Sequence, residues 1–228
     1  MPFRAQGIRL EPVINIHTGE ALYQEFLFPR DVAQASAASV QAFFDMAERS
    51  GLASWVDRSV LEVALDMLED DPKLRLGINL GYRLLVESGT FVLRSLRRRK
   101  PAVCQRLVIE VTEVGRPESW NVHDVLRGIK DLGACIALDD FGAGVHDRMA
   151  PFLIGTSITP NLVKLDGSLI KRAASSRAGA KQVSQVLKHA RLIGVSVIAE
   201  HIETTDLLQL VCDLGLQFAQ GRLFTQNY

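Results

Sequence analysis

Five short apolar runs in this chain each end in a polar or charged side chain. The runs cover residues 76–79, 107–110, 136–140, 162–166 and 195–200. Apolar runs of this length, with longer segments between them, are typical of buried parallel strands. Because parallel strands bring their C-terminal ends to one edge of a sheet, the pattern predicts that these polar groups gather in one place.

Eight segments in all have the length and apolar content of strands, and helical patterns lie between most of them. The predicted strands are residues 8–16, 21–28, 74–80, 106–112, 134–138, 162–165, 195–199 and 217–219. The predicted helices are residues 58–68, 122–132, 180–193 and 204–214, and Gly133, Gly194 and Gly215 stand where left-handed C-caps would end three of them. Strands alternating with helices indicate βα units, and eight of them predict an α/β fold of the TIM (β/α)8 barrel type.

The first two predicted strands depart from this alternation. Only residues 17–20 separate them, which is the spacing of a β-hairpin and is too short for a parallel crossover. The expected fold is therefore a modified TIM barrel with one antiparallel strand near the N-terminus.

Composition narrows the class of protein. At 228 residues and 47% hydrophobic content, the chain suits one domain over residues 1–228. Lysine plus arginine equals aspartate plus glutamate at 26 each, which argues against a nucleic acid polymer as partner. The basic run at residues 97–100 is interpreted as a helix end, where cations meet the negative end of the dipole. Three cysteines without CxxC spacing and no apolar run of about 20 residues favour a cytoplasmic protein without a membrane segment.

The strand ends would bring nine polar residues to one face of such a barrel. They are Glu25, Asn79, Glu110, Asp139, Asp140, Lys164, Asp166, Glu200 and Gln220. Carboxylate and amide oxygens are the ligands that Mg²⁺ and Mn²⁺ prefer, whereas zinc favours histidine or cysteine. The adjacent pair Asp139-Asp140 repels itself unless it takes up protons or binds a cation. Two ions beside a lysine favour metal-assisted phosphoester hydrolysis, although an enolisation with Mg²⁺ and lysine uses similar parts.

Seven motifs, in order along the chain, resemble those of EAL domains. They are Glu25-Phe26-Leu27, Ile78-Asn79-Leu80, Glu110-Val111-Thr112-Glu113, Asp139-Asp140-Phe141-Gly142-Ala143-Gly144, Lys164-Leu165-Asp166, Ala199-Glu200-His201-Ile202-Glu203 and Ala219-Gln220-Gly221-Arg222-Leu223-Phe224. The resemblance spans nearly the whole chain, and seven ordered motifs are far more specific than any one alone. It implies a modified α/β barrel that hydrolyses cyclic di-GMP, a bacterial second messenger, to linear pGpG with two Mg²⁺ or Mn²⁺ ions.

The resemblance also implies a role for each matching residue. The implied metal ligands are Glu25, Asn79, Glu110 and Asp139 for a first ion, and Asp139 and Asp140 for a second. Lys164 would orient or help deprotonate the attacking water, Glu200 would join the site through a water molecule, and Gln220 would sit at the rim beside the substrate. The implied supporting residues are Asp166, Glu203 and Glu113, the last as an anchor for the loop after Asp140.

Two departures from the family pattern define the alternative function. The family carries a phosphate-contacting arginine four residues after the first glutamate, where this chain has Pro29 and then Arg30, and residues 145–148 differ from the usual loop. A degenerate EAL domain would act as a cyclic di-GMP receptor or a protein-binding regulatory module. The resemblance further implies a homodimer, a regulatory domain or protein partner, and an EAL-like domain that is compatible with excision from a larger chain.

Overall fold

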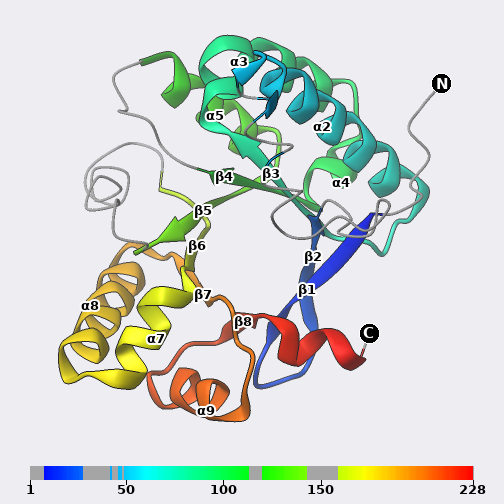
Figure 1. Ribbon diagram of the computed structural model, residues 1–228. Helices are drawn as coiled ribbons and strands as arrows, with labels where there is room; N and C mark the ends of the chain where they lie inside the picture. Colours follow the sequence, from blue (N-terminus) through cyan, green and yellow to red (C-terminus); the bar gives the residue numbers. More distant parts are fainter. Residues whose placement is uncertain are drawn as a thin grey trace.

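The computed structural model describes residues 8–27, 42, 46–47, 49–112, 120–142 and 159–227. Within these residues, eight strands close into a barrel in chain order, with helices outside the ring of strands (Figure 1). The strands are β1 Arg9–Asn15, β2 Ala21–Leu27, β3 Leu76–Gly81, β4 Leu107–Thr112, β5 Cys135–Phe141, β6 Leu162–Leu165, β7 Ser196–Ala199 and β8 Phe218–Gln220. The prediction of an eight-stranded α/β barrel is confirmed.

Strand β1 is the antiparallel member of the barrel. It pairs antiparallel with both β2 and β8, whereas the other six neighbouring pairs from β2 to β8 are parallel. Asn15 shapes the turn between β1 and β2, because its side-chain Oδ1 accepts from the backbone N–H of His17 at 3.0 Å and of Thr18 at 3.3 Å. The predicted hairpin is confirmed, and it explains why this barrel departs from the all-parallel pattern.

The helices cover the outside of the barrel. In the described residues they are α2 Ala53–Asp70, α3 Tyr82–Arg97, α4 Pro101–Cys104, α5 Trp120–Asp131, α7 Gly167–Ser175, α8 Arg177–Ile193, α9 Thr205–Asp213 and the 3-10 helix η1 Arg222–Asn227. The four predicted helices are confirmed as α2, α5, α8 and α9, although α5 ends one residue before the predicted end and α9 is one residue shorter than predicted at each end. Helices α3 and α7 lie outside the predicted ranges, because α3 follows β3 directly and α7 follows Asp166, so neither is preceded by a conspicuous loop.

The predicted helix ends are also confirmed. Gly133, Gly194 and Gly215 have φ of 95°, 73° and 80°, the left-handed conformation of a C-cap. Arg97 lies in the last turn of α3, as the interpretation of the basic run requires. Arg99 adds a second role, because it forms ion pairs of 2.6 to 3.1 Å with three carboxylates of α2, those of Glu62, Asp66 and Glu69.

No described helix is both long enough and apolar enough to cross a membrane. The apolar side chains instead form two groups. The larger one packs the helices onto the outer face of the strands. The smaller one fills the inside of the barrel, and its buried members are Val13, Tyr23, Val108, Ala137, Leu162 and Ile198. This inner group is the floor on which the polar strand ends rest.

Asp57 of α2 is linked to the end of β3. Its Oδ2 accepts from the backbone N–H of Gly81 at 3.0 Å, and burial outweighs this hydrogen bond and raises the pKa of Asp57 from 3.8 to about 6. The folded protein therefore binds this proton more tightly than the unfolded chain does, and the free energy of unfolding falls as pH rises from about 4 to about 6.

We expect Asp57→Asn to remove the loss of stability that comes from ionising the buried carboxyl group. The asparagine side chain keeps an oxygen that can accept the hydrogen bond from the backbone N–H of Gly81. Denaturant unfolding at several pH values should show equal stabilities near pH 3.5 and an advantage of about 3 kcal/mol for the variant above pH 7. A constant difference between pH 3.5 and pH 7 would contradict this assignment.

Candidate metal and phosphodiester site

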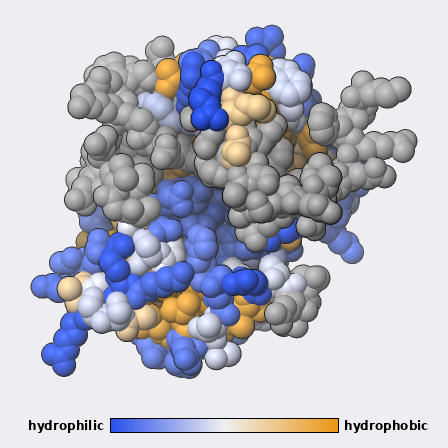
Figure 2. Space-filling view, viewed as in Figure 1, coloured by the Kyte–Doolittle hydropathy of each residue, from blue (hydrophilic) through white to orange (hydrophobic). Residues whose placement is uncertain are grey.

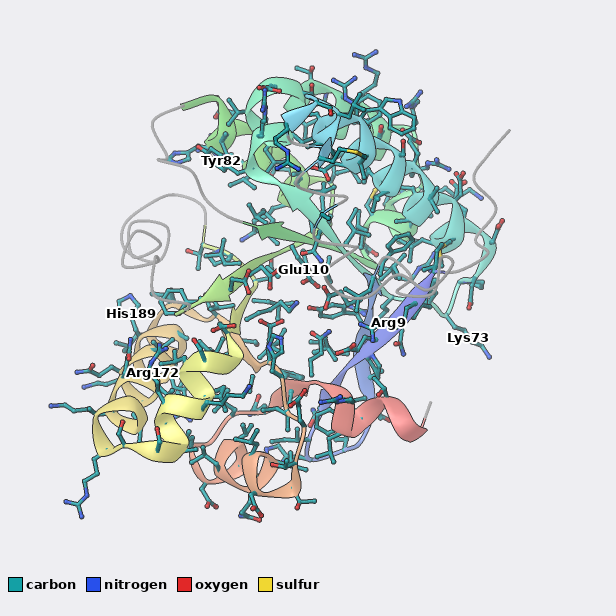
Figure 3. All side chains as sticks on the ribbon, viewed as in Figure 1. Arg9, Lys73, Tyr82, Glu110, Arg172 and His189 are labelled. Carbon is teal, nitrogen blue, oxygen red and sulfur yellow. The ribbon has the colours of Figure 1, made fainter. Side chains whose placement is uncertain are left out.

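The polar side chains at the strand ends form one layer inside the barrel. On several strands the polar residue stands two positions after a member of the apolar floor, as in Val108 and Glu110, Leu162 and Lys164, or Ile198 and Glu200. Side chains two residues apart on a strand point to the same face, so both sets point inward and the polar set lies above the floor. Figure 2 shows hydrophilic side chains at the centre of this face, and Figure 3 labels Glu110 inside the ring of strands.

Lys164 lies at the centre of this polar layer. Its side chain is 1% exposed, and its Nζ is 2.5 Å from Glu110 Oε2 and 2.9 Å from Glu200 Oε1. It is also 3.2 Å from both Glu25 Oε2 and Asp139 Oδ1. Burial lowers the pKa of Lys164, but the surrounding carboxylates, Glu110 first, outweigh burial and hold the pKa well above its ordinary value. Lys164 is therefore an ammonium group that forms ion pairs with four carboxylates, three of them on β2, β4 and β5 and the fourth directly after β7.

Glu25 is held by hydrogen bonds from two side chains besides Lys164. Asn79 Nδ2 donates to its Oε1 at 2.8 Å, and Gln220 Nε2 donates to its Oε2 at 2.5 Å. Burial by itself raises the pKa of Glu25, but Lys164 and these two amides outweigh burial and hold the pKa below its ordinary value. Glu25 is thus an ionised carboxylate of fixed orientation.

Glu110 and Glu200 behave differently from Glu25. Burial, followed by the charge of Glu25, raises the pKa of Glu110 to about 8, against the opposing effect of Lys164. Burial likewise raises the pKa of Glu200 well above its ordinary value. The reason is that a single ammonium group faces several buried carboxylates, so some of them keep protons unless another cation enters.

The end of β5 bends to place its two aspartates. The pairing of β5 with β6 shifts between Leu138 and Phe141, and Asp140 has φ of 53°. Carboxylate oxygens of Asp139, Asp140 and Glu200 all lie within 4.8 Å of one another, an arrangement that can hold a metal ion. Of the described non-glycine residues, only Asp140 and His201 have positive φ; Asp140 belongs to this cluster, and His201 directly follows Glu200. Such strain is typical of functional sites.

The donor atoms fit a hard divalent cation. Because the Nδ2 of Asn79 donates to Glu25, its Oδ1 is directed elsewhere, and this atom is buried without a hydrogen bond among the described residues. Glu200 Oε2 is likewise buried and unpaired. Buried oxygens without partners beside three clustered carboxylates are what Mg²⁺ or Mn²⁺ would satisfy.

Comparison with known proteins identifies the family of this chain. The model of the EAL domain family matches residues 7–227. The chain belongs to the EAL domain family. It is 27% identical over 208 residues to the cyclic di-GMP phosphodiesterase PdeF of Escherichia coli K12, covering 89% of this chain and 27% of PdeF. It is 26% identical over 227 residues to the cyclic di-GMP phosphodiesterase PdeL of the same organism, covering 95% of this chain and 60% of PdeL.

Solved structures of EAL proteins show the same fold. The EAL enzyme Bd1971 in its cAMP- and cyclic-di-GMP-bound form superposes with a TM-score of 0.77 at 25% identity, covering 98% of this chain and 63% of that chain. An EAL domain protein from Listeria monocytogenes EGD-e gives a TM-score of 0.78 at 22% identity, covering 94% of this chain and 85% of that chain. This EAL domain spans less than two thirds of the length of PdeF and PdeL.

The structure places the predicted supporting residues Asp166 and Glu203 outside the polar layer. Asp166 is the N-cap of α7, where its Oδ1 accepts from the backbone N–H of Ser168 at 2.9 Å. Glu203 is exposed and pairs with Arg222 of η1 at 2.7 Å. Gln220 is 5% exposed and holds Glu25, so it lies within the layer and not at its rim, and its predicted contact with substrate stays a prediction. Arg30, Glu113 and the loop at residues 143–158 lie outside the described residues.

Three residues that the motifs do not include also bear on the site. Tyr23 and Gly77 stand two positions before Glu25 and Asn79, so the same alternation that marks the site points them inward. Arg172 of α7 donates to the backbone carbonyl of Gly142 at 2.7 Å, directly after the Asp139-Asp140 turn. The two-residue alternation of side chains along a strand could have identified Tyr23 and Gly77 from the sequence. The Arg172 contact depends on the tertiary structure and could not have been identified in this way.

Proposed function

We propose that this EAL domain hydrolyses cyclic di-GMP to linear pGpG in bacterial second-messenger signalling, with two Mg²⁺ or Mn²⁺ ions as cofactors. The observation that supports this proposal is the buried polar layer, in which most proposed metal ligands lie beside Lys164 or donate to a residue that does. The exception is Asp140, whose carboxylate lies within 4.8 Å of those of Asp139 and Glu200. The relatives PdeF and PdeL are cyclic di-GMP phosphodiesterases by name, which supports this choice of substrate.

The proposed ligands divide into two sets that share Asp139. Glu25, Asn79, Glu110 and Asp139 would hold a first ion, and Asp139 and Asp140 would hold a second, which Glu200 joins through a water molecule. The unpaired Oδ1 of Asn79 supports the first set. The close oxygens of Asp139, Asp140 and Glu200 support the second.

The residues of the layer suit the hydrolysis of a phosphodiester. Divalent ions at such a site supply positive charge to phosphate oxygens and lower the pKa of water. The Lys164 ammonium donates hydrogen bonds that orient the attacking water or the phosphate oxygens. Carboxylates close to Lys164, such as that of Glu200, accept the proton that the attacking water releases. Water adds its oxygen to phosphorus while one P–O bond of the ring breaks, and the departing sugar oxygen takes up a proton. The product is linear pGpG.

Further parts of the proposal concern the surroundings of the site. Arg30 and Gln220 are proposed to bind substrate, and Glu113 to anchor the loop after Asp140. We propose a homodimer, regulation by a further domain or protein partner, and a cytoplasmic location. Sedimentation of the purified chain, with and without cyclic di-GMP, tests the homodimer directly.

Turnover of cyclic di-GMP by the purified chain with Mn²⁺ is the first expected result. Glu25→Ala should lower turnover by at least about 10³-fold, because it removes an ionised ligand and the partner of Asn79, Gln220 and Lys164. Glu20→Ala is the matched control, since Glu20 is exposed in the hairpin before β2. Chromatography of cyclic di-GMP and pGpG measures the rates.

The same experiment tests the alternative function. Tight binding of cyclic di-GMP without turnover by the wild type would contradict the enzyme and favour a receptor, as the Pro29-Arg30 departure suggests. Neither binding nor turnover by a folded chain would point to a protein-binding regulatory module.

A further inference from the structure

Tyr23 is the polar exception in the apolar floor beneath the site. It lies on β2, two residues before Glu25, and is 2% exposed. Its hydroxyl is buried without a hydrogen bond among the described residues. Buried polar groups in native proteins are nearly always paired, so an unpaired hydroxyl beneath a charged layer calls for a functional explanation.

The space at Gly77 brings Tyr23 and Glu110 to the same point. Gly77 lies on β3, between β2 and β4, and pairs with Glu25 on one side and Val108 on the other. A Cβ atom at Gly77 would be 2.5 Å from Tyr23 Cε2 and 2.6 Å from Glu110 Oε1. Cε2 is bonded to the carbon that carries the hydroxyl, so the hydroxyl end of the Tyr23 ring lies on the side of the Glu110 carboxylate. The two groups can approach each other here because residue 77 has no side chain.

Glu110 presents the complementary atom. Its Oε2 accepts from Lys164 at 2.5 Å, whereas its Oε1, the atom on the Gly77 side, is buried without a hydrogen bond. The hydroxyl of a tyrosine carries a proton at neutral pH, so Tyr23 can donate to this oxygen. The Tyr23 hydroxyl, a donor, and Glu110 Oε1, an acceptor, therefore lie on the same side of the barrel at Gly77.

We propose that Tyr23 is a positioning residue for the metal site, whose hydroxyl donates to Oε1 of Glu110 and fixes the orientation of that carboxylate. Two carboxylate oxygens offer about four lone-pair directions, so Tyr23 and Lys164 leave room for an ion. Partners of this kind orient ligands and typically change metal affinity by about 10- to 100-fold. The inference rests on the proposed function, because it takes Glu110 as a metal ligand.

Tyr23→Phe tests the proposal, because it removes one oxygen atom and keeps the ring. We expect calorimetric titration with Mn²⁺, in the absence of cyclic di-GMP, to show an affinity about 10- to 100-fold weaker than that of the wild type. Tyr82→Phe is the matched control, since Tyr82 begins α3 and lies well apart from Glu110 (Figure 3). It should bind Mn²⁺ as the wild type does.

Thermal unfolding separates positioning from a purely structural role. For Tyr23→Phe we expect only a small change in Tm without metal, because the net contribution of one hydrogen bond is small, and a smaller rise in Tm on adding Mn²⁺ than the wild type shows. Equal Mn²⁺ affinities of Tyr23→Phe and Tyr82→Phe would overturn the proposal and leave the proposed function intact. Absence of Mn²⁺ binding by the wild type would overturn both.

Discussion

Lys164→Met is expected to abolish turnover and to destabilise the metal-free protein by about 3–5 kcal/mol, the range for breaking a buried ion pair by removing one partner. Lys164 is 1% exposed and is the cation that the carboxylates of Glu25, Glu110, Asp139 and Glu200 share. Without it, buried carboxylates face one another with no counter-charge. Denaturant unfolding in the presence of a chelator measures the loss.

The pH dependence of this loss has a defined sign. Carboxylates left without Lys164 have raised pKa values in the folded state, so they take up protons as pH falls and their repulsion disappears. The destabilisation should therefore be smaller at pH 5 than at pH 8. Mn²⁺ should raise the Tm of the variant more than that of the wild type, because the ion replaces the missing charge.

Lys181→Met is the matched control for this prediction. Lys181 is exposed on α8, so its removal should change the free energy of unfolding by less than about 0.5 kcal/mol. If Lys164→Met were as stable as Lys181→Met at pH 8 without metal, the central place of Lys164 in the electrostatics of the layer would be refuted.

The barrel and most of its polar layer were predictable from the sequence because they follow from local patterns. A run such as 107–110 shows its apolar character and its terminal carboxylate in four consecutive residues, and eight segments of strand length leave few folds to consider. The hairpin was equally local, since residues 17–20 are too few for a crossover.

Interactions that depend on strand register could not be predicted from those patterns. That Gly77 makes room for Tyr23 and Glu110 follows only once β2, β3 and β4 are aligned. The burial of Gln220 against Glu25 joins residues 195 positions apart. The positive φ of Asp140 arises where the pairing of β5 with β6 shifts, and no glycine or asparagine marks that position.

Asp139→Asn is expected to lower turnover by at least about 10³-fold and to eliminate binding of both ions, because Asp139 belongs to both proposed ligand sets. Its side chain is 12% exposed and pairs with Lys164 at 3.2 Å, at the junction of the two sets. Asparagine keeps the size and one oxygen but loses the charge. Calorimetric titration with Mn²⁺ measures the number of ions bound.

Asp140→Asn should differ from Asp139→Asn in the number of ions that remain. Asp140 belongs to the second set alone, so its variant should keep one Mn²⁺ where the wild type binds two, and should also lose turnover. Asparagine tolerates the left-handed conformation of position 140, so the fold is preserved.

Asp213→Asn is the control for both aspartate variants. Asp213 is exposed at the end of α9, where it accepts from Gln209, and an amide oxygen can accept the same hydrogen bond. It should bind two ions and turn over at the rate of the wild type. If Asp139→Asn and Asp140→Asn bound the same number of Mn²⁺ ions, the proposal that Asp139 is a ligand of both ions would be contradicted. Loss of a ligand shared by two ions should remove more ions than loss of a ligand of one.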